Sequence, residues 1–125
     1  MPTVSRESAA HVDDYGMAED RHEDIVGQTV SFVTIRQEMD LAPLLKGLPD
    51  DRCPCPHWGY VFKGKLTWRF AGHEEVSKAG DAFYVSGGHV PVAQADTEFV
   101  IFSPAEELRA VDAVMVKNIQ AMQTA

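Results

Sequence analysis

The sequence predicts one all-β domain that is followed by a single C-terminal helix. Its 125 residues suit one domain, and 45% of them are hydrophobic, which is enough for a core. Between residues 25 and 103, short runs rich in β-branched and aromatic residues alternate with turn residues. Strands at this regular spacing, with no helical periodicity between them, are typical of a sandwich or barrel. After residue 103 the apolar residues recur at three- and four-residue steps, which indicates a helix.

The first segment, residues 1–24, is expected to be a flexible acidic arm. It carries seven of the 19 acidic residues but only two of the 11 basic ones, and it shows no apolar period. A run of charge of this kind usually stays solvated. We therefore expect an arm outside the barrel; the alternative is that it contains one strand, which pairs with the body or with a partner subunit.

The barrel, residues 25–103, is expected to begin with a strand over residues 29–39. Shorter strands are expected at 56–62, 66–70, 74–78, 82–85 and 97–102, with turn residues between them. Because only Lys63-Gly64-Lys65 separates the expected strands 56–62 and 66–70, we expect these two strands to pair as a hairpin.

The last segment, residues 104–125, has both a helix start signal and an apolar face. Ser103, Pro104 and Glu106 fit the N-cap, N1 and N3 positions of a capping box. One apolar stripe follows at helical spacing: Leu108, Val111, Met115, Ile119 and Met122. We expect this helix to pack on the barrel or on the partner subunit of a homodimer.

The composition argues against several classes of partner. Lysine and arginine are not clustered and the net charge is −8, so nucleic acid is not expected as a partner. No run of 18 apolar residues exists to span a membrane, and the N-terminus lacks the pattern of a secretory signal. We therefore expect a cytoplasmic protein with reduced thiols. A disulfide between Cys53 and Cys55 would be strained, so both are expected to be free thiols or ligands.

The stretch GDAFYVSGGHVP, residues 80–91, resembles one of the two sequence motifs of the cupin superfamily. That motif runs Gly, five residues, Pro-x-Gly, two residues, His. Gly80 and Gly88 match it, while Ser86 stands at the proline position. Pro91 stands at the histidine position, and His89 comes two residues earlier.

The other cupin motif runs Gly, five residues, His-x-His, three or four residues, Glu, six residues, Gly, and it is altered here. Counting forward from Gly47 places Cys53 and Cys55 at the two histidine positions, and counting back from Gly64 places His57 at the glutamate position. Both assignments hold if the segment between Cys55 and His57 is two residues shorter than in the motif. A deletion of two residues leaves each side chain on the same face of a strand, because side chains alternate with a period of two. If the segment is extended, as its two prolines favour, all three side chains point the same way.

The resemblance covers residues 29–103 and implies a jelly-roll barrel that holds a divalent metal. The metal ligands would be His57, His89 and one or both of Cys53 and Cys55. Thiolate and imidazole ligands together suit zinc best and iron second. His57 and His89 are also the candidate catalytic residues. The competing interpretation is that the thiols are small buried apolar groups and that His57 is a hydrogen-bonded core histidine.

The resemblance further implies a small-molecule enzyme that works in the barrel lumen with help from the metal. Isomerase, cyclase or lyase chemistry ranks before dioxygenation, because the usual set of histidines is absent. Catalysis by a histidine beside a thiol without a metal is one alternative, and a ligand-binding or sensor protein without turnover is another. The candidate ligand contacts, which the core could equally use, are Tyr60, Trp68, Arg69, Phe83 and Tyr84.

Residues 57, 59 and 61 share one face of their predicted strand, and residues 58, 60 and 62 share the other. Which of the two faces points into the barrel stays open.

Overall fold

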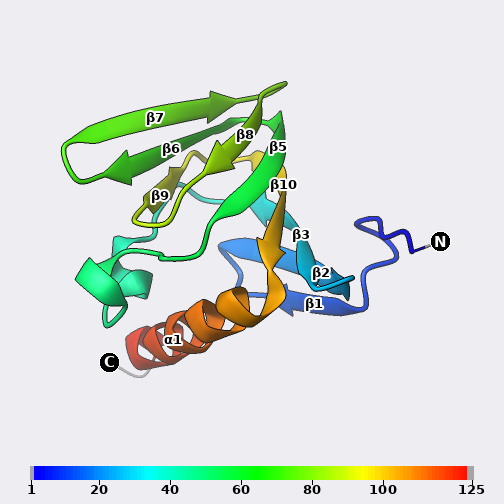
Figure 1. Cartoon of the computed structure of the whole chain (residues 1–125), viewed down its shortest axis with the longest axis horizontal. Coiled ribbons are helices and arrows are strands. Elements are labelled where there is room, and N and C mark those ends of the chain that lie inside the picture. The colour runs from blue at the N-terminus through cyan, green and yellow to red at the C-terminus, as the bar shows by residue number, and fades with distance from the viewer. Residues whose placement is uncertain (1, 124–125) are drawn as a thin grey trace.

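The computed structural model describes residues 2–123, which form two antiparallel sheets and one long helix (Figure 1). The larger sheet has six strands, in the order β1 (His11–Asp14), β2 (Ala18–Ile25), β3 (Gln28–Ile35), β10 (Thr97–Pro104), β5 (His57–Lys63) and β8 (Ala82–Val85). The smaller sheet has four, in the order β4 (Met39–Asp40), β9 (Val90–Ala93), β6 (Lys65–Phe70) and β7 (His73–Lys78). The 3-10 turns η1 (Ala42–Leu45) and η2 (Pro49–Asp51) lie between β4 and β5. The expected all-β jelly-roll barrel with a C-terminal helix is confirmed.

One apolar core joins the two sheets. Burying each of its larger aliphatic and phenyl side chains contributes roughly 1.5–3 kcal/mol. The Trp68 indole N–H, a polar group in this core, donates to Ser77 Oγ at 3.1 Å. The core residues are Ala18, Ile35, Val61, Val85 and Phe99 from the larger sheet and Leu66, Trp68 and Ala93 from the smaller one.

Strand β5 has one face inside the barrel and the other at the surface, which resolves the question that the sequence leaves open. His57 and Val61 are 6% and 0% exposed, so the odd-numbered residues point inward. At Gly59 a Cβ would collide with the ring of Phe83, so the inner face has no room for a side chain there. The opposite face exposes three aromatic rings: Trp58, Tyr60 and Phe62.

The hairpin expected between residues 56–62 and 66–70 is wrong. β5 pairs with β10 and β8, whereas β6 pairs with β7 and β9 in the other sheet. Gly64, at a φ of 84°, turns the chain from one sheet to the other. A Cβ at this position would also collide with Thr97. The turn signal in the sequence is real, but it marks a crossing between sheets.

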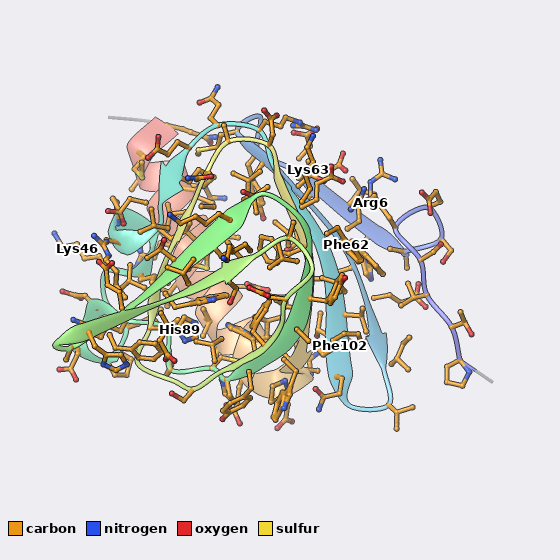
Figure 2. The ribbon with its side chains drawn as sticks, turned by 90° about the horizontal axis from the view of Figure 1, so that it is seen from above. Arg6, Lys46, Phe62, Lys63, His89 and Phe102 are labelled. Atoms are coloured by element: carbon orange, nitrogen blue, oxygen red, sulfur yellow. The ribbon has the colours of Figure 1, made fainter. Side chains whose placement is uncertain are left out.

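Part of the segment expected as a flexible arm belongs to the larger sheet. β1 and β2 pair as a hairpin, and β2 pairs with β3 from Ala18 to Ile25. Polar residues on the cavity side of β2, such as Asp20, hide the strand from a search for apolar alternation. Arg6, labelled in Figure 2, lies ahead of β1. Its Nη1 lies 2.7 Å from Glu98 Oε1, which ties this segment to β10.

The helix α1 (Ala105–Gln123) lies across one end of the barrel (Figure 1). Asn118 Nδ2 donates to the carbonyl oxygens of Leu44 and Lys46 at 2.7 and 2.9 Å, which fixes the helix to η1 and the residue after it. The expected apolar stripe is buried at Leu108, Val111 and Ile119, while Met122 is 54% exposed. No helix within residues 2–123 is long and apolar enough to cross a membrane. The expected homodimer stays a prediction.

Candidate metal centre

Three side chains that are far apart in the sequence meet inside the barrel. Ligand atoms of Cys53, His57 and His89 all lie within 4.8 Å of one another, and the three residues are 4%, 6% and 1% exposed. Cys53 Sγ lies 3.7 Å from His57 Nε2. Two ligands of a tetrahedral zinc, at about 2.0–2.3 Å from the metal, lie roughly 3.3–3.6 Å apart. The widest possible separation in the cluster, 4.8 Å, thus exceeds the zinc-bound value by roughly 1.2–1.5 Å, which side-chain rotation can close.

Backbone pairing brings Cys53 and His89 together. The amide of Cys53 donates to the carbonyl of His89 at 2.9 Å, and the amide of Gly88 donates to the carbonyl of Cys53 at 2.8 Å. The loop can approach this closely because Gly87 has no side chain, and a Cβ there would collide with the backbone of Pro54. The two glycines before His89 thus bring its ring up to the start of β5.

The ring of His57 is oriented by Ser103. His57 Nδ1 lies 2.7 Å from Ser103 Oγ, so Nε2 is the nitrogen that faces Cys53. Burial, with a smaller contribution from His89, lowers the pKa of His57 to about 3, so the ring is neutral at physiological pH. Ser103 lies in β10 opposite Thr29, and its hydroxyl contacts His57. The sequence motif that suggested a helix cap therefore marks the residue that orients a candidate ligand.

The ring of His89 presents a free lone pair. Its Nδ1 lies 2.7 Å from the carbonyl oxygen of Ser86, and because a carbonyl only accepts, Nδ1 carries the proton. Nε2 is then an acceptor, and it is buried without a hydrogen-bond partner. Burial lowers the pKa of His89, so protonation does not supply the missing contact. A metal ion is the partner that such an atom fits, and the donor set of the cluster agrees with this.

The thiol of Cys53 is protonated in this environment. Burial raises its pKa to about 11, and the neighbouring His57 is too weakly basic to take the proton. The pair is therefore neutral, which argues against an activated thiolate nucleophile. A metal beside the sulfur would reverse this, because a coordinated thiol loses its proton.

Cys55 does not join the cluster. It is fully buried among apolar side chains, and its Sγ lies 3.5 Å from the carbonyl oxygen of Pro56. The expectation that residues 53, 55 and 57 share one face fails because β5 begins only at His57, so the alternation of a strand does not extend through residues 54–56. Burial raises the pKa of Cys55 to about 12, as suits a packed thiol.

A cavity of about 250 Å³ opens beside the three side chains. Its wall is mainly apolar and is contributed by both sheets and by the helix, with Val33, Trp68 and Met115 among its members. His89 packs edge-on against the Trp68 ring, with ring centres 5.3 Å apart. Solvent access to the candidate ligands is therefore limited to the cavity itself.

Of the five expected ligand contacts, Trp68 alone lines this cavity. Arg69 Nη2 pairs with both carboxylate oxygens of Asp40, at 2.8 and 2.9 Å, on the surface. Tyr60 and Tyr84 are 40% and 56% exposed on the outer face of the sheet. Phe83 packs against the Trp68 ring behind the cavity wall.

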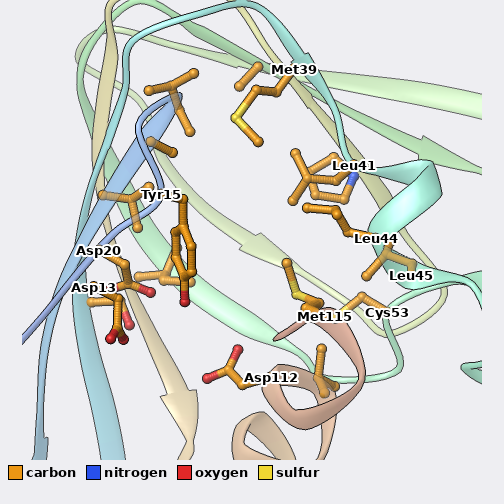
Figure 3. Close-up of a pocket in the computed structure, with 18 of the residues that line it drawn as sticks. Asp13, Tyr15, Asp20, Met39, Leu41, Leu44, Leu45, Cys53, Asp112 and Met115 are labelled. Carbon is orange, nitrogen blue, oxygen red and sulfur yellow. The ribbon is translucent and has the colours of Figure 1, made fainter. Parts of the chain in front are cut away.

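Sequence reasoning misses the polar residues at the far end of the cavity, where three carboxyl side chains gather (Figure 3). They are Asp13 and Asp20 from the N-terminal hairpin and Asp112 from the helix. Burial is the main cause that raises the pKa of the partly buried Asp20 to about 7, whereas Asp13 and Asp112 are more exposed. One signal was available: Asp112 follows Leu108 by four residues and so lies beside the apolar stripe.

Known proteins resemble this chain in structure, whereas no family model and no curated protein matches its sequence. A protein of unknown function from Rhizobium leguminosarum bv. viciae has a TM-score of 0.60 at 13% identity, over 82% of this chain and 94% of the other. Ectoine synthase from P. lautus has a TM-score of 0.57 at 13% identity, over 83% and 78%. An RmlC-like cupin from Shewanella frigidimarina has a TM-score of 0.55 at 16% identity, over 81% and 88%. At these identities the likeness shows the fold alone.

Proposed function

We propose that this chain, which has the fold of the cupins, is a metal-dependent small-molecule enzyme whose reaction takes place in the barrel cavity. The observation that carries the proposal is the group of Cys53, His57 and His89, whose ligand atoms converge at the wall of a mainly apolar cavity. The unpartnered Nε2 of His89 is the most specific part of this observation. Buried polar atoms are almost always hydrogen-bonded, so a buried acceptor without a donor is unusual in an apolar core.

Zinc is the proposed metal and iron the second choice, because one thiolate and two imidazoles are borderline-soft ligands. Three protein ligands leave a coordination position for water or substrate, as catalytic rather than structural zinc sites do. A metal held there would act as a Lewis acid on a substrate oxygen. This chemistry suits an isomerase, cyclase or lyase, and it requires no redox change.

The chain's own side chains prepare this chemistry. Ser103 holds the His57 ring so that Nε2 faces the centre, and the carbonyl of Ser86 fixes the tautomer of His89. Trp68 covers one side of His89 and keeps water away from it. Cys53 supplies the one negative charge of the set when its proton leaves, which lowers the charge of the centre and strengthens metal binding.

Metal content in cysteine variants tests the proposal directly. The protein, purified without a chelating tag, is expected to carry about one zinc or iron per chain by elemental analysis. Cys53→Ala is expected to lose it, whereas Cys55→Ala is the matched control, since it removes an equally buried thiol outside the group, and is expected to keep it. A wild-type protein that takes up no metal even after zinc is added would contradict the proposal.

Turnover then separates an enzyme from a ligand-binding or sensor protein with the same metal centre. Small molecules that raise the melting temperature of the metal-loaded protein are incubated with it, and their consumption is followed by NMR. Consumption that stops in His89→Ala supports the enzyme. Thermal shifts without any consumption across the library favour the sensor.

A further inference from the structure

The end of the cavity that lies away from the candidate metal centre is acidic, and His22 is its one basic neighbour within the described part of the chain. Asp13, Asp20 and Asp112 line it, and no lysine or arginine is found among the cavity-lining residues within the described part of the chain. Figure 3 shows the three carboxyl groups at one end of the cavity, with Cys53 at the other. The cavity is thus polarised, with an imidazole and thiol group at one end and carboxyl groups at the other.

Three elements build this acidic end. Asp13 of β1 lies directly opposite Asp20 of β2 in the strand register, and Asp112 approaches from α1. His22 Nε2 lies 2.9 Å from Asp13 Oδ2, so Asp13 already has a partner. One carboxylate oxygen of Asp20 is buried without any hydrogen bond. The fold therefore holds the Asp20 carboxyl group near two others, with one of its oxygens left without a hydrogen-bond partner.

This arrangement is costly unless a ligand completes it. A desolvated carboxylate without a partner is unfavourable, and two further carboxyl groups nearby add repulsion. His89 supplies an independent observation at the same cavity: it is 1% exposed, and its Nε2 also lacks a partner. Both ends of the cavity thus present buried acceptors to the space between them, while the wall between the ends is apolar.

The acidic end does not fit a second metal ion. The only His, Cys, Asp and Glu side chains within residues 2–123 that converge closely enough to hold a metal are Cys53, His57 and His89. A cation that spreads its contacts over several carboxyl groups at longer range is the better match, and an ammonium group with three donors has this property.

We propose that the cavity binds a small aliphatic amine, with its ammonium group among Asp13, Asp20 and Asp112 and its chain along the apolar wall. The cavity volume of about 250 Å³ equals that of roughly eight water molecules at about 30 Å³ each, which suits a small ligand. The oxygen-bearing group at the other end of the ligand would face Cys53, His57 and His89. That second assignment rests on the proposed function, whereas the ammonium subsite stands without it.

The test uses probes that separate the two ends. Binding is measured by ¹H–¹⁵N NMR titration at pH 8, on metal-loaded and on metal-free protein. The probes are n-pentylammonium, its uncharged counterpart 1-pentanol, and the pair 5-aminopentanoate and pentanoate. We expect n-pentylammonium to bind about tenfold more tightly than 1-pentanol with or without metal, and 5-aminopentanoate about tenfold more tightly than pentanoate.

Variants localise the ammonium. Asp20→Asn and Asp112→Asn are each expected to weaken n-pentylammonium about tenfold while leaving 1-pentanol unchanged. Glu74→Gln, which removes the same charge from an exposed position on β7, is the matched control and is expected to bind as the wild type does. His89→Ala is expected to keep n-pentylammonium binding.

The outcomes separate this inference from the metal proposal. Equal binding of n-pentylammonium and 1-pentanol, or equal ammonium binding by wild type and both Asp variants, overturns the ammonium subsite. A wild-type protein that takes up no metal even after added zinc, but still binds n-pentylammonium, overturns the proposed function and leaves the subsite standing.

Discussion

His57 Nδ1 lies 2.7 Å from the hydroxyl oxygen of Ser103, across two neighbouring strands of the larger sheet. This contact fixes which ring nitrogen faces Cys53, and it connects a residue 46 positions further along the chain to the candidate metal centre. Hydrogen bonds of this kind, from a ligand's second nitrogen to a fixed group, commonly decide how well the ligand holds a metal.

Replacing Ser103 is therefore expected to weaken the metal site without removing a ligand. In Ser103→Ala the His57 ring loses its fixed orientation, and zinc affinity is expected to fall about tenfold, as for other partners of metal ligands. Competition with a chromophoric chelator measures this. Ser103→Thr keeps the hydroxyl and is expected to recover most of the affinity. Zinc affinity in Ser103→Ala equal to that of the wild type would show that the contact is only structural.

Metal binding is expected to release about one proton per zinc at pH 7.5. The pKa of Cys53 is raised to about 11 by burial, so its thiol carries a proton before the metal arrives. The pKa of His57 is lowered to about 3 and that of His89 is also lowered, so neither imidazole has a proton to release from its ligand nitrogen. Calorimetry in two buffers with different ionisation enthalpies measures the release. Zinc binding to the wild type without proton release contradicts the thiol as a ligand.

The buried carboxyl of Asp20 is expected to make the protein less stable as the pH rises. Burial raises its pKa from 3.8 to about 7, despite the opposing effect of His22, and Asp13 and Asp112 add to the rise. The folded state therefore binds the proton more tightly than the unfolded state, and its stability falls between about pH 4 and pH 7 as this group ionises.

Asp20→Asn removes this penalty. At about 1.4 kcal/mol per pKa unit the full effect is about 4 kcal/mol, and solvent at the cavity reduces it to about 1–2 kcal/mol. Urea unfolding is expected to show Asp20→Asn gaining stability over the wild type at pH 8 but not at pH 4. The same gain at both pH values would show that packing, and not ionisation, is the cause.

Gly87 is expected to be essential for the approach of His89 to Cys53. A Cβ at Gly87 would collide with the backbone of Pro54, so Gly87→Ala has to push the two segments apart. We expect a loss of about 2–3 kcal/mol in the free energy of unfolding, together with weaker zinc binding. Gly72→Ala is the comparison, because a Cβ there meets nothing within 4 Å and only its φ of 91° opposes the change. Equal stability of the two variants would contradict the steric role of Gly87.

The sequence predicts the barrel and part of the site for different reasons. Turn residues and β-branched runs report local geometry, so the helix and most strands follow from them, whereas β1, β2 and β9 were not among the expected strands. Cys53, His57 and His89 follow from their place in two altered motifs, and the structure brings their ligand atoms within 4.8 Å of one another. The expectation for Cys55 depended on strand alternation through residues 54–56, and there the chain forms no strand.

The acidic end of the cavity depends on long-range packing that local pattern does not encode. Asp20 belongs to a run of charge that usually stays in solvent, and its position inside the barrel follows only from the pairing of β2 with β3. Asp112 meets it because α1 closes the end of the barrel. Ser103 was misassigned for a similar reason, since its partner His57 comes from another strand.

The most direct test of the central claim is X-ray absorption at the zinc edge of the metal-loaded protein. We expect one sulfur at about 2.3 Å and two imidazole nitrogens at about 2.0–2.1 Å from the zinc, with a further oxygen from solvent. The sulfur is expected to disappear in Cys53→Ala and to remain in Cys55→Ala. A first shell with no sulfur, or with two sulfurs, would contradict the centre formed by Cys53, His57 and His89.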